Sequence, residues 1–207
     1  MTMLLYADSQ FTSPYAMSVF VALKVKKLPF DIKALDLAAE ANTDPEYART
    51  SVTQRVPTLL DGDFALSESS AITEYLNDLY SDPPIYPTDR KQLARARQVQ
   101  AWLRSDFMPI RLERSTTTIF YHPISTPLSA EAQIAAQKLC AGAGELLSHG
   151  GENLFGGWCI ADIDLALMLN RLIVNGDAVP ADLVRYAQAQ WQHPAIQQWV
   201  RRERPPL

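Results

Sequence analysis

Cysteine is scarce in this chain of 207 residues, which contains two, Cys140 and Cys159. They form no CxxC motif, and a single pair provides no disulfide framework, so the sequence indicates neither a dithiol redox site nor a small disulfide-stapled domain. The three histidines, His122, His149 and His193, have neither ligand spacing nor carboxylate-rich neighbours. We therefore expect no bound metal ion.

Long apolar runs and an excess of basic charge are missing as well. No segment is long enough to cross a bilayer, and the start of the chain lacks the charged, apolar and cleavage regions of a secretory signal. With 23 acidic against 19 basic residues, the formal net charge is -4. This balance gives no electrostatic reason to bind nucleic acid or an anionic membrane, and we expect a cytoplasmic protein.

Hydrophobic residues make up 47% of the chain, which is enough for one large core or two smaller ones. A proline-rich stretch interrupts the patterning near the middle of the chain. It predicts a linker over residues 81–89, between a first domain of residues 1–80 and a second of residues 90–207.

The first domain alternates strand and helix signals. Residues 3–6 form a short apolar run, helical spacing follows to residue 28, and residues 30–37 alternate apolar and polar side chains. A short helix is predicted from Pro45, Asp61-Gly62 is typical of a β-hairpin turn, and another helix begins near residue 67. This order of strands and helices predicts an α/β thioredoxin-like fold.

The second domain has helical periodicity and no strand signal, so we expect an all-α helical bundle. The strongly apolar residues 161–174 predict its buried central helix. The other predicted helices are residues 91–113 with a bend near Pro109, a helix from Ser129 to Gly150-Gly151, and two helices that begin near Pro180 and Pro194.

Ser13 and Pro14 open the first predicted helix, directly after the first strand and a short loop. The N–H groups at a helix start lack intrahelical partners and the dipole is positive there, so an anion or a thiolate is stabilised. Ser is also a favoured N-cap and Pro a favoured first helical residue, so helix capping explains the pair equally well. Ser9 and Thr12 are rival hydroxyls in the same loop.

Several motifs occur together in one order along the chain: Ser13-Pro14-Tyr15, Val56-Pro57, Glu68-Ser69-Ser70-Ala71-Ile72 and Cys159-Ile160-Ala161-Asp162. In a thioredoxin-like domain followed by a helical domain, they resemble the cytosolic glutathione transferases over essentially the whole chain. The strings from Ala94 to Asp106 and from Asn153 to Gly156 are similar to the enterobacterial YfcF-type members, and the active hydroxyl is of the serine type.

This resemblance implies that glutathione supplies the reactive sulfur as co-substrate, with no metal. A glutaredoxin would carry Cys-Pro-Tyr-Cys where this chain has Ser-Pro-Tyr-Ala, so a protein dithiol is excluded here. In the family's mechanism the Ser13 hydroxyl donates a hydrogen bond to the glutathione sulfur, and the helix start adds a positive field. Together these interactions lower a free-thiol pKa of roughly 8.5 by about one to four units.

The resemblance also assigns the glutathione contacts. Val56, before a cis Pro57, pairs its backbone with the cysteinyl part of glutathione as an added strand. Ser69 suits the γ-glutamyl carboxylate and Glu68 the α-ammonium, although ordinary helix capping explains both residues too. Arg55 is assigned to the glycyl carboxylate, and surface solvation explains it equally well.

The pocket for the electrophile is assigned to the long helix after the linker, which in similar proteins faces the thiol across the domain cleft. Four residues carry this assignment: Trp102, Phe107, Met108 and Arg111. Core packing explains the two aromatic side chains equally well.

Asp162 is assigned to folding, because the family caps its buried helix with a Ser/Thr-x-x-Asp box. Here Cys159 stands at the cap position, which removes the hydroxyl acceptor. We expect Cys159 and Cys140 to be small buried residues and not nucleophiles.

The sequence therefore predicts a homodimeric detoxification enzyme in which the thiolate attacks hydrophobic electrophiles and organic hydroperoxides. One alternative is a glutathione-dependent disulfide reductase or isomerase. Another is a non-catalytic glutathione-binding stress protein.

Overall fold

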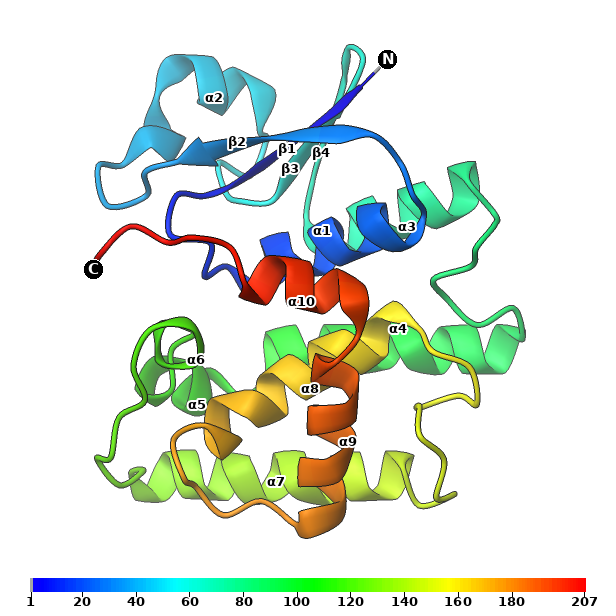
Figure 1. Cartoon of the computed structure of the whole chain (residues 1–207), viewed down its shortest axis with the longest axis vertical. Coiled ribbons are helices and arrows are strands. Elements are labelled where there is room, and N and C mark those ends of the chain that lie inside the picture. The colour runs from blue at the N-terminus through cyan, green and yellow to red at the C-terminus, as the bar shows by residue number, and fades with distance from the viewer. Residues whose placement is uncertain (1) are drawn as a thin grey trace. The chain divides into compact units, whose positions relative to one another are not determined.

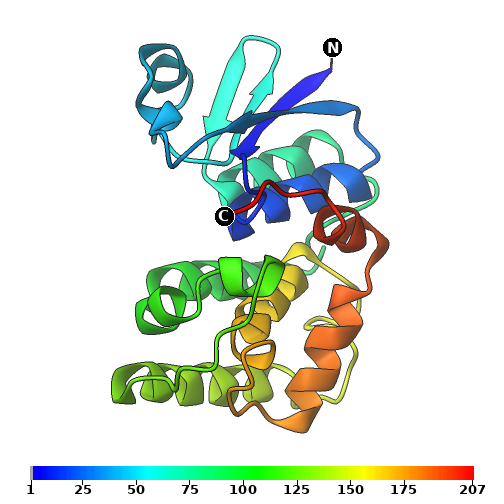
Figure 2. The same ribbon diagram turned by 60° about the vertical axis from the view of Figure 1, so that its left-hand side comes forward.

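The computed structural model describes residues 2–207, which separate into two compact units. The first unit comprises the chain up to Ile85 together with Pro194–Leu207, and the second comprises Tyr86–His193. Figures 1 and 2 show the elements of each unit from two directions. None of the described helices is long and apolar enough to span a membrane.

The first unit is built on a four-stranded sheet in the order β2-β1-β3-β4. Strand β1 pairs with β2 in parallel and with β3 antiparallel, and β3 and β4 form an antiparallel hairpin. The strands are β1 (Met3–Asp8), β2 (Phe30–Leu35), β3 (Thr58–Asp61) and β4 (Phe64–Ser67). The helices are α1 (Pro14–Val25), the 3-10 turn η1 (Ala41–Thr43), α2 (Pro45–Thr50), α3 (Ser69–Leu79) and α10 (Pro194–Val200). This arrangement confirms the thioredoxin-like prediction.

Both faces of the sheet are covered, because side chains alternate along β1. Helices α1 and α3 lie on one face and α2 on the other (Figures 1 and 2). On the α2 face, Tyr6 packs with Leu35 and Tyr47. Residues 16–23 of α1 are all buried, since this helix is enclosed by the sheet, α3 and α10. The site described below therefore begins at a helix that is packed on three sides.

The second unit is all-α and consists of six helices among the described residues: α4 (Arg90–Ser105), α5 (Met108–Glu113), α6 (Thr117–Phe120), α7 (Ala130–Leu146), α8 (Ile160–Ile173) and α9 (Ala181–Trp191). Helix α8 is buried along almost its whole length and contacts each of the other five, which confirms the predicted central helix. Ser129 caps α7, where its Oγ accepts the Ala132 N–H at 3.2 Å, as the sequence predicts.

The predicted long helix over residues 91–113 is wrong in one respect, because it is two helices separated at Asp106 and Phe107. Phe107 has a φ of 61°, and the Asp106 carboxylate accepts the Phe107 N–H at 3.0 Å, where a helical carbonyl would otherwise bind. Pro109 lies in the first turn of α5, a position that proline tolerates. The chain therefore turns before the proline and not at it.

The final segment packs with the first unit. Helix α10 and the residues after it group there, although they follow the helical unit in the chain, and the domain boundaries of the sequence analysis remain a prediction. The cause is aromatic packing, since Trp199 is fully buried and its ring lies 5.2 Å from that of Phe20 on α1.

Candidate functional site

The loops that carry the predicted binding residues extend from one end of the sheet. In the strand register Thr58, the first residue of β3, lies opposite Tyr6 near the end of β1 and opposite Ser67, the last residue of β4. The end of β1, the start of β3 and the end of β4 are therefore adjacent. Residues 9–13, 54–57 and 68–69 continue from these three points.

Ser13 is the N-cap of α1. Its Oγ accepts the Ala16 N–H at 3.2 Å, and Pro14 follows as the first helical residue. The cap uses the oxygen as an acceptor, so the hydroxyl proton stays available, and it has no acceptor within residues 2–207. A partly exposed O–H donor thus stands at the positive end of a 12-residue helix.

Asp8 is a site residue that sequence reasoning missed. Its carboxylate is buried and accepts the Thr12 N–H at 2.7 Å, the Thr12 hydroxyl at 2.9 Å and the Ser13 N–H at 3.0 Å. These bonds fix the loop between β1 and α1 from within. The available signal was an aspartate two residues after the predicted strand, followed by hydroxyl residues at the next helix start.

Hydrogen bonding and position distinguish the three candidate hydroxyls, those of Ser9, Thr12 and Ser13. The Thr12 proton is donated to Asp8, so in this geometry it is not available to a ligand. Ser9 lies beside β2, where its N–H donates to the Leu35 carbonyl at 2.8 Å, on the side of β1 away from β3 and β4. Of the three, Ser13 is therefore the residue that stands at the helix start with its hydroxyl proton available.

Val56 precedes β3 in a bend, and the Val56-Pro57 peptide is cis. Within residues 2–207, the Val56 backbone makes no hydrogen bond to another backbone group. The preceding carbonyl, of Arg55, is held from behind by the Tyr47 hydroxyl at 2.7 Å and the Thr58 hydroxyl at 3.1 Å. The Arg55 side chain itself is exposed and forms no ion pair among the described residues.

Glu68 and Ser69 lie where β4 passes into α3. Glu68 occupies the N-cap position with φ 75° and ψ 115°, but its exposed side chain makes no capping hydrogen bond. Ordinary capping therefore does not describe Glu68, whose carboxylate faces solvent. Ser69 is buried and is the first residue of α3, beside the N–H groups at the helix start.

The residues predicted for the electrophile lie in the helical unit and differ in exposure. Phe107 is 1% exposed and packs edge-on against Trp102 at 4.7 Å, an arrangement that favours a core role for Phe107. Met108 is 53% exposed, and Arg111 donates to the Arg104 carbonyl at 2.6 Å. These two reach the surface of α5.

Asp162 organises the start of α8, as predicted. Its buried carboxylate accepts the Leu154 N–H at 2.8 Å, the Cys159 N–H at 2.9 Å and the Tyr186 hydroxyl at 2.8 Å. Burial raises the pKa of Asp162, and burial with the adjacent carboxylate raises the pKa of Cys159. Burial likewise raises the pKa of the half-buried Cys140. Both cysteines are therefore thiols at neutral pH and poor nucleophiles.

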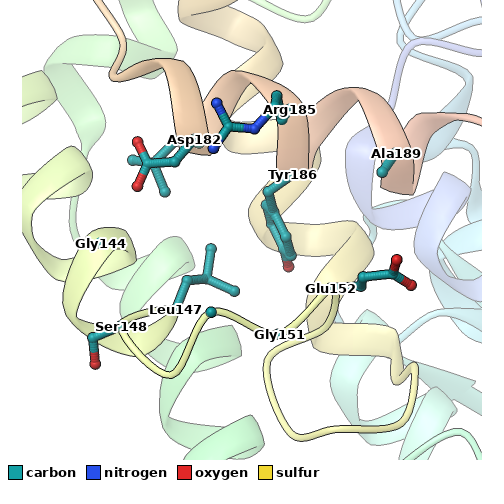
Figure 3. A pocket seen from close by; sticks show the side chains of 11 residues that line it. Gly144, Leu147, Ser148, Gly151, Glu152, Asp182, Arg185, Tyr186 and Ala189 are labelled. Atoms are coloured by element: carbon teal, nitrogen blue, oxygen red, sulfur yellow. The ribbon is translucent and has the colours of Figure 1, made fainter.

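One pocket of about 530 Å³ lies in the helical unit, between the end of α7, residues 150–152 and α9 (Figure 3). Leu147, Leu183 and Tyr186 line it together with Asp182 and Arg185. None of the predicted glutathione-site residues lines this pocket. Among residues 2–207, no three His, Cys, Asp or Glu side chains gather into a group that could hold a metal ion.

Comparison with known families gives two matches that together cover most of the chain. The family described as glutathione S-transferase, N-terminal domain, matches residues 11–84. The family described as glutathione S-transferase, C-terminal domain, matches residues 89–203.

Individual relatives agree with these matches. The crystal structure of a glutathione transferase homolog from Burkholderia gl BGR1 with bound glutathione is 44% identical, covers 97% of both chains and superposes with a TM-score of 0.80. Glutathione S-transferase theta-1 is 31% identical over 130 residues in Homo sapiens and 30% identical over 147 residues in Mus musculus. These matches cover 62% and 70% of this chain, and the aligned part spans 52% and 58% of the respective relatives.

Proposed function

The chain belongs to the glutathione S-transferase family, and from this membership we propose that it binds glutathione at the end of the sheet and activates the sulfur through Ser13. The observation that carries the proposal is the state of the Ser13 hydroxyl. Its oxygen is occupied as the cap of α1, and its proton is available to a ligand. A thiolate bound there accepts this proton in a hydrogen bond and lies in the positive field of the helix start.

The remaining contacts follow from the chemistry of the three loops. The Val56 backbone offers the cysteinyl part a donor and an acceptor. Ser69 with the first N–H groups of α3 suits the γ-glutamyl carboxylate, and the exposed Glu68 carboxylate suits the α-ammonium. Arg55 supplies an exposed cation for the glycyl carboxylate. The 44% identical homolog with bound glutathione supports this ligand.

The two interactions with sulfur have separable magnitudes. A hydrogen bond to a charged acceptor contributes about 1.5–3 kcal/mol, and a helix start contributes about 0.3–1 kcal/mol at an exposed position. Since 1.36 kcal/mol corresponds to one pKa unit, they lower the thiol pKa by about one to three units. From roughly 8.5, this brings the thiol pKa to about 5.5–7.5, so the thiolate fraction at neutral pH rises from a few per cent to between about a quarter and nearly all of the bound glutathione.

The proposed reaction is nucleophilic attack by this thiolate. On a carbon electrophile, a carbon–sulfur bond forms and the leaving group departs with its electron pair. On an organic hydroperoxide, sulfur takes the terminal oxygen, the alcohol is released, and a second glutathione converts the sulfenic acid to the disulfide and water. Trp102, Phe107, Met108 and Arg111 remain predictions for contacts with the electrophile, and the homodimer remains a prediction from the family.

Exchange through a protein thiol is the less favoured chemistry, because both cysteines have raised pKa values and Cys159 is 1% exposed. Product analysis with a chloro-nitroarene, an alkyl hydroperoxide and a mixed disulfide separates the reactions. The proposal expects turnover of the first two substrates that depends on Ser13. Turnover of the mixed disulfide alone would overturn it.

A further inference from the structure

The loop that carries Ser13 has an unusual backbone conformation at its central residue, Phe11. Phe11 has a φ of 50°, in the left-handed region that bulky side chains rarely adopt. Its N–H donates to the Asp8 carbonyl at 3.0 Å, which closes a turn within the loop. A bulky residue keeps such a backbone conformation when surrounding contacts hold it there.

These contacts come from the far end of the chain, which lies on α1 (Figure 1). The Trp199 ring, fully buried on α10, meets the Phe11 ring edge-on at 5.6 Å and 89°. The Arg202 guanidinium carbon lies 4.2 Å from the centre of the same ring. The Phe11 ring thus makes an edge-to-face contact with Trp199 and a cation–π contact with Arg202, and both contacts are attractive.

Arg204 forms a hydrogen bond with the backbone of the loop. One guanidinium nitrogen donates to the Phe11 carbonyl at 3.2 Å and to the Trp199 carbonyl at 3.0 Å. The other donates to the carbonyls of Val200 and Arg202, both at 2.9 Å. One planar cation therefore ties the C-terminal end of α10 to the backbone of the Ser13 loop.

We propose that Trp199, Arg202 and Arg204 form a positioning clamp that holds Phe11 and, through it, fixes where the Ser13 hydroxyl meets the glutathione sulfur. The inference rests on the proposed function of Ser13. Asp8 holds the loop from within, and the clamp holds it from outside. Because two peptide bonds separate Phe11 from Ser13, a shift of the clamped residue moves the donor.

The effect expected on catalysis follows from the short reach of a hydrogen bond. A displacement of about 1 Å costs on the order of 100-fold in rate, so a variant in which the loop is partly released should lose about tenfold in kcat. A purely electrostatic effect of the two arginines is a distinct mechanism, because a nearby positive charge also favours a thiolate. The two mechanisms are separable, since a lysine keeps the charge and loses the planar fork.

The test uses the full chain with Arg202→Ala, Arg204→Ala, Arg204→Lys and the matched control Arg201→Ala. Arg201 is exposed, and its side chain makes no hydrogen bond, ion pair or ring contact with the loop among the described residues. Three quantities are measured for each variant: thermal stability, the dissociation constant of glutathione, and the pKa of the bound thiol from the ultraviolet absorbance of the thiolate. Turnover of a chloro-nitroarene is measured alongside them.

The clamp predicts that both alanine variants raise the bound-thiol pKa and lower kcat about tenfold, while the control does neither. Arg204→Lys should show the same raised pKa and lowered kcat as Arg204→Ala. A bound-thiol pKa that is ordinary in the unmodified protein overturns the proposed function. If the bound-thiol pKa is low in the unmodified protein and equally low in every variant, the clamp is overturned and the proposed function stands. If Arg204→Lys restores the pKa and kcat of the unmodified protein, the arginine acts through its charge and not by positioning the loop. If Arg204→Ala does not fold, Arg202→Ala decides, because the Arg202 guanidinium lies over the Phe11 ring at 4.2 Å and the Phe20 ring at 5.9 Å and does not bind the loop backbone among the described residues.

Discussion

Replacing Asp8 with asparagine perturbs the Ser13 loop without changing the size of the side chain. The carboxylate accepts three hydrogen bonds, two from Thr12 at Oδ2 and one from the Ser13 N–H at Oδ1. Asparagine has one oxygen and one amino group in these places. It retains the two bonds from Thr12 at best, and its amino group then faces the Ser13 N–H, donor against donor.

The cost of this exchange follows from the lost acceptor. Loss of one hydrogen bond to a charged group, with its partner left unsatisfied at a part-buried site, costs about 1–3 kcal/mol of unfolding free energy. For a chain of this size, each 1 kcal/mol lowers Tm by about 2–4 °C. Displacement of Ser13 should also lower kcat/KM for glutathione by about tenfold.

Asp36→Asn is the matched control. Asp36 also accepts two backbone N–H groups, from Ala38 at 3.0 Å and Ala39 at 3.2 Å, but both bonds end on the same oxygen. The single oxygen of asparagine can keep them, so we expect little change in Tm or kcat/KM. Thermal unfolding and steady-state kinetics of both variants check the difference. Equal behaviour of Asp8→Asn and Asp36→Asn would refute the role given to Asp8.

Two further predictions concern the helical unit. Gly142→Ala should lower the unfolding free energy by about 1–3 kcal/mol, because an added Cβ would lie 2.5 Å from the Trp102 ring. Gly144→Ala places its Cβ in open space, so it should raise the unfolding free energy by about 0.5–1 kcal/mol. Urea unfolding that ranks the two variants in the opposite order would contradict this packing. Hydrogen bonds from Lys138 and Ser129 lower the pKa of Asp106 and Glu113 below their usual 3.8 and 4.5, so the unfolded state takes up protons first and stability falls as the pH drops below about 4.5. Acid unfolding of Asp106→Asn combined with Glu113→Gln should show a shallower loss over this range, and an unchanged profile would exclude these two groups as its cause.

Local patterns predicted most of the architecture because each depends on neighbours in sequence. The Asp-Gly pattern predicted the hairpin, but the turn itself is Gly62-Asp63, because Asp61 still pairs with Phe64 as the last residue of β3; Gly62 has a φ of 65°. The strongly apolar run that begins at residue 161 lies in α8, the buried central helix. Ser13-Pro14 likewise predicts the start of α1, since capping is a local property. These signals need no knowledge of tertiary contacts.

The features that the sequence did not predict depend on contacts between distant residues or on competing local geometries. The packing of Trp199 on Phe20 joins positions 179 residues apart, so periodicity could not show which unit α10 would join. The helix break at Asp106 was hidden by Pro109, a stronger breaker in sequence that is tolerated in a first helical turn. The role of Asp8 appeared only when the loop geometry placed its carboxylate on Thr12 and Ser13.

The central claim is that the Ser13 hydroxyl keeps glutathione as a thiolate. It is tested most directly by titrating the bound thiol in the unmodified protein and in Ser13→Ala, with the ultraviolet absorbance of the thiolate as the signal. The account predicts a pKa below that of free glutathione in the unmodified protein and a rise of about one to two units in Ser13→Ala, with glutathione still bound. An identical pKa in the two proteins would contradict it.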